Sequence, residues 1–151
     1  KEAIYAALLA QLLTDWLQPV RDIDPEGEPV EEILNYAKHK MKMSRLYPRE
    51  SRLYANEIIQ GAPRIKSVLT CELRDVVKSL AQLINNWSEA GLIRVIDPYH
   101  LIFSIWAMTQ HYADFNVQVL AAWDKDAMND DDFEEVVVSL TQVILKGCGI
   151  E

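Results

Sequence analysis

Apolar residues recur every three or four positions along most of the chain, which is the spacing of an amphipathic α-helix. The pattern predicts six helices, over residues 3–20, 30–47, 50–60, 63–90, 98–123 and 131–146. Prolines and glycines fall at the ends of these segments, apart from Pro19, near which the first helix should bend or end. Since no segment has the pattern of a convincing strand, the predicted fold class is all-α.

The two long segments nearest the C-terminus carry more apolar surface than one small subunit can cover. Residues 98–123 are apolar on nearly every face, which is typical of a helix covered both by its own subunit and by a partner. The last helix carries an apolar stripe as well, and the two together favour a homodimer. The candidate interface residues are Leu101, Ile105, Met108, Tyr112, Phe133, Val136, Val137, Leu140, Val143 and Ile144.

Composition narrows the class of protein. The 151 residues include 15 Lys and Arg and 23 Asp and Glu, for a net charge of −8, and this acidity disfavours nucleic-acid binding by the chain alone. No apolar run reaches the roughly 18–20 residues that cross a bilayer. Cys71 and Cys148 have no metal-site spacing, and two isolated thiols fit a reducing compartment. We therefore expect one cytoplasmic domain without a membrane partner.

Catalytic signatures are absent from the sequence. It contains no glycine-rich phosphate loop, no HExxH and no GxSxG, so we predict neither an enzyme nor a bound cofactor. His111, with Asp114 three residues later, could contribute to a metal site with Glu57 or Asp75, but no pattern fixes those further ligands. The alternative, which we favour, is that His111 forms a hydrogen bond across a helix or subunit contact.

An aromatic and amide group is the more informative combination. Trp106 and Gln110 are four residues apart, so they project from the same side of one helix, and Trp16 lies on the apolar side of the first helix. A flat ligand could stack on the indole rings while the primary amide binds its polar edge. From spacing alone, the opposite interpretation is favoured, in which both tryptophans are core residues and Gln110 bonds to a neighbouring side chain.

Several strings resemble the regulatory domain of TetR-family transcriptional regulators, with a likeness that runs from Lys1 to about Val119. The strings are KEAIY at 1–5, SRLY at 51–54, GAP at 61–63, IDP at 96–98, HLIF at 100–103, IWA at 105–107 and TQHYADF at 109–115. The resemblance implies that a helix-turn-helix domain precedes Lys1, outside this chain, and that operator DNA is bound through that domain only. It also implies a homodimer in which the last two long helices form a four-helix bundle with their mates.

The resemblance also implies a place for a small-molecule effector. In the pyrimidine-responsive members of the family, the effector is bound by a tryptophan of the first regulatory helix and by a tryptophan and a glutamine of the penultimate one. These residues correspond to Trp16, Trp106 and Gln110, and the candidate site is completed by Leu13, Leu17, Tyr54 and Glu57.

The expected function is that of the effector-binding and dimerisation domain of a bacterial repressor. The expected effector is a small planar molecule, with uracil and thymine as the candidates. The alternative is a helical dimerisation or protein-interaction module that binds no small-molecule effector, in which the tryptophans and Gln110 belong to the core.

Overall fold

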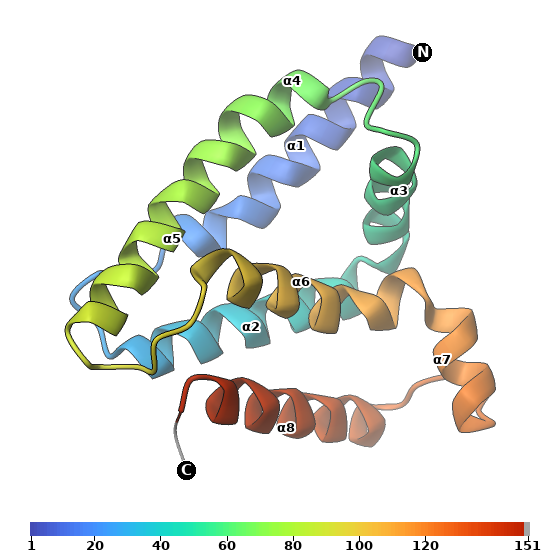
Figure 1. The fold of residues 1–151 in the computed structure, drawn as a ribbon. Helices are drawn as coiled ribbons and strands as arrows, with labels where there is room; N and C mark the ends of the chain where they lie inside the picture. Colours follow the sequence, from blue (N-terminus) through green and yellow to red (C-terminus); the bar gives the residue numbers. More distant parts are fainter. Residues whose placement is uncertain (150–151) are drawn as a thin grey trace.

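The computed structural model describes residues 1–149, and within that range it is helical and contains no strand (Figure 1). The elements in chain order are α1 (Glu2–Arg21), α2 (Pro29–Leu46), α3 (Pro48–Ile59), α4 (Lys66–Val68), the π-helical segment η1 (Leu69–Leu73), α5 (Arg74–Glu89), α6 (Pro98–Asp114), α7 (Asn116–Trp123) and α8 (Asp130–Gly147). The all-α prediction is confirmed. No helix among these residues has both the length and the apolar character needed to cross a membrane.

The prediction of one helix over residues 98–123 is wrong, because the chain breaks at Phe115 into α6 and α7. Phe115 leaves the helical conformation, with φ −115° and ψ 29°. At this point Arg52 of α3 donates a hydrogen bond to the carbonyl oxygen of Ala113, at 3.0 Å. A side chain thus satisfies a carbonyl that a continuing helix would pair with an amide, so α6 can end here without a buried orphan acceptor.

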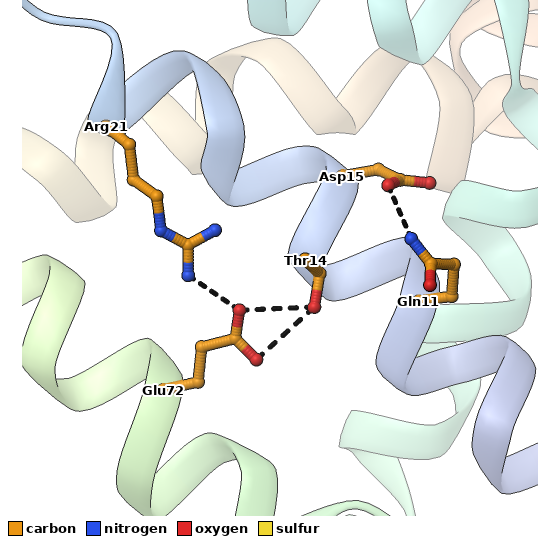
Figure 2. A network of polar contacts seen from close by, with 5 residues as sticks. All are labelled: Gln11, Thr14, Asp15, Arg21 and Glu72. Atoms are coloured by element: carbon orange, nitrogen blue, oxygen red, sulfur yellow. Dashed lines mark hydrogen bonds and ion pairs between the residues drawn. The ribbon is translucent and has the colours of Figure 1, made fainter.

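The predicted helix over residues 63–90 is a single rod that is irregular near its N-terminal end. The rod begins after Gly61 and Ala62, whose φ angles of 87° and 55° reverse the chain. Between α4 and α5, five residues adopt the wider π-helical winding. This winding places Glu72 of the rod beside α1, where it accepts hydrogen bonds from Thr14 at 3.1 Å and from Arg21 at 2.6 Å (Figure 2). The rod and α1 therefore lie side by side as one joined pair (Figure 1).

Helix α6 is the central element of the domain. It contacts α2, α3, α5 and α7, and its buried residues Leu101, Ile102 and Ile105 join one core with residues of α2 and α5. Helix α8 lies against α2 on the opposite side from α1 (Figure 1). Burial of apolar surface on both sides of α2 is the main source of stability for this arrangement.

The helix break and the packing of α8 change which residues are open to a partner. Five of the ten residues predicted for a dimer interface are buried within the subunit, so their side chains form its core: Leu101, Ile105, Val136, Leu140 and Ile144. Four others are half-buried: Met108, Tyr112, Phe133 and Val137. Of the predicted residues, Val143 is 54% exposed, and Val138, which sequence reasoning missed, is 56% exposed on the same helix.

Candidate ligand-binding cavity

A small cavity lies where α1, α2, α3, the π-helical segment and α6 meet. Its lining comprises Leu13, Trp16, Leu17, Tyr36, Lys40, Tyr54, Leu73, Trp106 and Gln110. Six of the seven residues predicted as a ligand site are thus brought together, from the three helices α1, α3 and α6. Tyr36, Lys40 and Leu73 were not predicted.

The indole of Trp106 is fixed by a hydrogen bond between helices. Its Nε1 donates to the hydroxyl of Tyr36 on α2, with a nitrogen–oxygen distance of 2.7 Å. Burial raises the pKa of Tyr36 to about 12, although the bond from Trp106 acts in the opposite direction. Tyr36 is therefore a neutral phenol that accepts from Trp106 and keeps its own O–H proton for another acceptor.

Trp16 is the second tryptophan of the lining, and its ring contacts two groups. The ring of Tyr54 packs against it edge to face, with centroids 5.3 Å apart and planes at 75°. The Nζ of Lys40 lies over the indole, 5.4 Å from its centroid. Edge-to-face packing and a cation over an indole are both favourable arrangements, so the ring is held from two sides.

Gln110 presents its carboxamide to the cavity one turn beyond Trp106. Among residues 1–149, no hydrogen bond joins its amide to another residue, although it is half-buried. The described residues therefore contain no side chain that pairs with Gln110, as the alternative interpretation requires. An amide in such a position offers one donor and one acceptor edge to a molecule in the cavity.

Lys40 is the charged residue of the lining. It is only 8% exposed, and burial lowers the pKa of its ammonium to about 8, with the charge of Asp114 acting against this shift. A signal for Lys40 and Tyr36 was available in the sequence. Both occupy the apolar stripe of α2, at the helical spacing of the buried residues Ile33 and Ala37, where a lysine is exceptional.

The free space is narrow. It amounts to about 40 Å³, enough for a few water molecules, whereas ligand pockets of proteins are usually roughly 300 Å³ or more. A planar ligand therefore has to displace part of the lining, and the side chains with freedom to move are those without a fixed hydrogen bond. Lys40 and Gln110 both meet this condition.

Glu57, the seventh predicted residue, does not line this cavity. It is 1% exposed, and its carboxylate accepts from the backbone N–H of Arg64 at 2.7 Å and from the Arg64 guanidinium at 3.0 Å. The carboxylate thus closes the turn between α3 and α4. The prediction of Glu57 as a ligand-site residue is therefore wrong, because its carboxylate is bonded to Arg64 outside the cavity.

His111 lies on the outside of α6. Its ring stacks on Phe115, with centroids 5.1 Å apart and planes at 23°, and the side chain is exposed. Across the part of the chain that the structure describes, no three His, Cys, Asp or Glu residues form a cluster able to hold a metal ion. Within the described residues His111 thus forms neither a metal cluster nor a hydrogen bond to another helix, and the alternative of a hydrogen bond across a subunit contact stays a prediction.

A second cavity, of about 330 Å³, opens beside the C-terminal part of α6. Its walls come from α2, α6, α7, α8 and the segment between the last two helices, and they include Met41, Tyr112, Ala127 and Phe133. Three predicted interface residues, Tyr112, Phe133 and Val136, lie in this wall. The second cavity is roomier, but it lacks the pairing of indole rings with an unbonded amide found in the first.

Comparison with known proteins adds independent information on the chain. Residues 9–151 match the family described as YcdC-like protein, C-terminal region. The chain is 39% identical over 147 residues to the HTH-type transcriptional regulator RutR of Escherichia coli strain K12, an alignment that covers 97% of this chain and 69% of that protein. The HTH-type transcriptional regulator RutR of Shigella flexneri has the same identity and coverage.

Glu57→Ala should lower the free energy of unfolding by about 2 kcal/mol, because Arg64 loses the acceptor for its N–H and its guanidinium. Glu57→Gln, which keeps an acceptor oxygen, should lose less. Urea denaturation measures both. The neighbouring exposed residue provides the control Asn56→Ala, and an equal loss in that variant would contradict the role of the carboxylate.

The burial of Lys40 predicts a pH dependence of stability. Its pKa is lowered from 10.5 to about 8 on folding, so between these values the unfolded chain binds the proton more tightly and stability rises with pH. Tyr36 and Tyr54, whose pKa values are raised to about 12, oppose this above pH 10. Between pH 8 and pH 10, the unmodified chain should gain about 2 kcal/mol relative to Lys40→Met, measured by urea denaturation. Parallel curves for the two proteins would show that Lys40 is solvated.

Proposed function

Because the chain belongs to the YcdC-like C-terminal region family of TetR-type transcriptional regulators, we propose that it is the effector-binding and dimerisation domain of such a regulator. The relatives are transcriptional regulators and not enzymes. The proposed effector is a small planar molecule, a pyrimidine such as uracil or thymine, and the proposed site is the cavity between Trp16 and Trp106. Operator DNA would be bound by a helix-turn-helix domain joined to the N-terminal end of α1.

One observation carries the effector proposal: the unbonded carboxamide of Gln110 beside the fixed indole of Trp106. The amide has no partner in the protein and is not sealed from solvent, so its donor and acceptor are available to a molecule in the cavity. A pyrimidine dione has adjacent N–H and C=O groups, which match the acceptor and donor of a carboxamide. Its flat ring matches the faces of the indole rings.

The position of the cavity supports a regulatory role, because a ligand there would touch α1 and the core at the same time. Leu13, Trp16 and Leu17 belong to α1, whereas Trp106 and Gln110 belong to the central helix. A ligand that binds better to one placement of α1 shifts the equilibrium toward it. A coupling of about 1–3 kcal/mol between effector and DNA is sufficient for a useful switch.

Exposed apolar residues of α8 and α6 support dimerisation. Val138 and Val143 are each more than half exposed, on different sides of α8 because they are five residues apart, and Tyr99 and Phe103 on α6 are 42% and 47% exposed. Exposed apolar side chains on the two long C-terminal helices are what an interface between two copies requires. We propose that the bundle between subunits forms through these outward residues rather than through the buried ones.

Uracil and thymine should bind to the chain with a saturable heat in isothermal titration, and Gln110→Ala should weaken that binding by at least about tenfold through loss of the paired hydrogen bonds. Gln118→Ala on α7, where the glutamine is exposed, is the matched control and should bind as the unmodified chain does. Quenching of tryptophan fluorescence gives a second readout for the same titration.

Two results would contradict parts of this proposal. No binding of either base by a folded sample would remove the pyrimidine assignment. Binding that survives Gln110→Ala but is lost in Ala127→Trp, which fills the second cavity, would move the site to that cavity.

The double change Val138→Glu with Val143→Glu should convert the dimer to monomer, because four charges would be brought together in one apolar interface. Sedimentation velocity measures the shift in mass. Val95→Glu is the control, since Val95 is 84% exposed and lies outside α6 and α8. A dimer that persists in the double variant would place the interface on another face.

A further inference from the structure

The ammonium of Lys40 faces the cavity without a close anion. Its Nζ lies over Trp16, and the side chain is more than nine-tenths buried. In residues 1–149, the four ion pairs use other cations, namely Arg21, Arg45, Arg64 and Lys125. Lys40 is thus a cation on a largely buried side chain, whose Nζ packs on an indole face, makes no ion pair and keeps some contact with solvent.

That compensation is incomplete. An indole attracts a cation, but the pKa of Lys40 still falls to about 8, which means that burial outweighs every favourable contact that the ammonium makes. The carboxylate whose charge acts on Lys40 is Asp114, which is not part of the cavity lining and accepts a hydrogen bond from Ser51 Oγ at 2.5 Å. An anion bound in the cavity would supply the close negative charge that Lys40 lacks.

The other polar groups of the lining also offer donors. Tyr36 accepts from Trp106 and keeps a free O–H, and Tyr54 contributes a second hydroxyl. Gln110 provides a donor and an acceptor, and no carboxylate belongs to the lining. The cavity is therefore rich in donors and positively charged, so a complementary ligand carries acceptor oxygens and negative charge.

We propose that Lys40 determines the ligand class of this site, and that the preferred ligand is a planar heterocycle bearing a carboxylate. The ring stacks on Trp16, the carboxylate accepts a hydrogen bond from Lys40 Nζ, and the ring edge pairs with Gln110. This inference rests on the proposed function and makes it narrower, because a neutral pyrimidine would leave the ammonium without a counter-ion.

The net charge of −8 does not argue against an anionic ligand. Charges on exposed side chains are screened over roughly 8–10 Å at physiological salt, whereas a direct contact with a buried ammonium is screened much less. Hydrogen bonds between ionised partners are also about twice as strong as neutral ones. The local interaction therefore outweighs the distant repulsion.

The test uses two probes that differ by one carboxylate: orotate, a pyrimidine carboxylate, and uracil. Isothermal titration at pH 6.5 should give an affinity for orotate at least about tenfold higher than for uracil. Lys40→Met should lose about tenfold or more for orotate and less than about threefold for uracil. The control is Lys38→Met, because Lys38 lies on the exposed face of the same helix. Lys40→Arg keeps the charge and should retain the preference for orotate, and circular dichroism checks that each variant is folded.

A change of pH provides a readout that a purely structural role of Lys40 would not move. Raising the pH from 6.5 to 8.5 leaves about a quarter of Lys40 protonated, so orotate binding should weaken about fourfold in the unmodified chain and not in Lys40→Met. The other ionisable groups near Lys40 are Tyr36 on its own helix, Tyr54 on α3 and Asp114 on α6. Both tyrosines have pKa values of about 12, well above this range.

The outcomes separate this inference from the function on which it rests. Binding of uracil without binding of orotate overturns the role of Lys40 and leaves a pyrimidine sensor standing. Equal orotate affinity in the unmodified chain and in a folded Lys40→Met also overturns it. If a folded chain binds neither compound, both the inference and the pyrimidine assignment fail.

Discussion

The domain depends on whether the polar side chains of its central helix find hydrogen-bond partners, because this helix is packed on three sides. Helix α6 contacts α2, α3 and α5, so each polar group that it turns inward needs a partner or a cost is incurred. The indole N–H of Trp106 has such a partner, since it donates a hydrogen bond to the hydroxyl of Tyr36 on α2 at 2.7 Å. That bond joins the two most extensively packed helices at one point and fixes the orientation of an indole face. The Trp106 wall of the cavity is therefore positioned by the packing of α6 on α2.

Two other polar groups at the same junction have no protein partner among the described residues, and the proposed binding of a ligand rests on them. Gln110 lies one turn beyond Trp106 and has no hydrogen bond to the residues described, and Lys40 lies one turn beyond Tyr36 and has no ion pair there. A core selected for stability alone would replace both by apolar residues of similar volume. Both groups keep some contact with solvent, and the proposed ligand would take the place of that water. The same reasoning does not apply to Glu57, since Arg64 satisfies its carboxylate in full.

Much of this architecture could be predicted from the sequence, for identifiable reasons. Helix positions follow from apolar spacing and from proline and glycine at the ends, which are local properties. The break at Phe115 was missed because its cause is tertiary: Arg52, more than sixty residues earlier, takes the carbonyl of Ala113. The π-helical winding near Glu72 was missed for the same reason, because the residues that hold Glu72 belong to α1. Within the candidate site, aromatic and amide residues were found by family resemblance. Lys40 was not found, although it lies at the helical spacing of the buried residues Ile33 and Ala37, because lysine is rarely a buried residue.

The two sides of α1 suggest how binding could become movement. On one side, Thr14 and Arg21 hold Glu72 of the rod, and this contact is partly exposed to solvent, so its strength is modest (Figure 2). On the other side, Leu13, Trp16 and Leu17 line a space of about 40 Å³ that is too small for a ring. A ligand that enters must push α1 away from α6 or displace Lys40 from the face of Trp16. We propose that α1 is displaced while α6 stays in place, against the weak polar contact with the rod and the burial of Leu9, Leu13 and Val20. Any domain attached to the beginning of α1 would then move with it while the core and α8 remain in place.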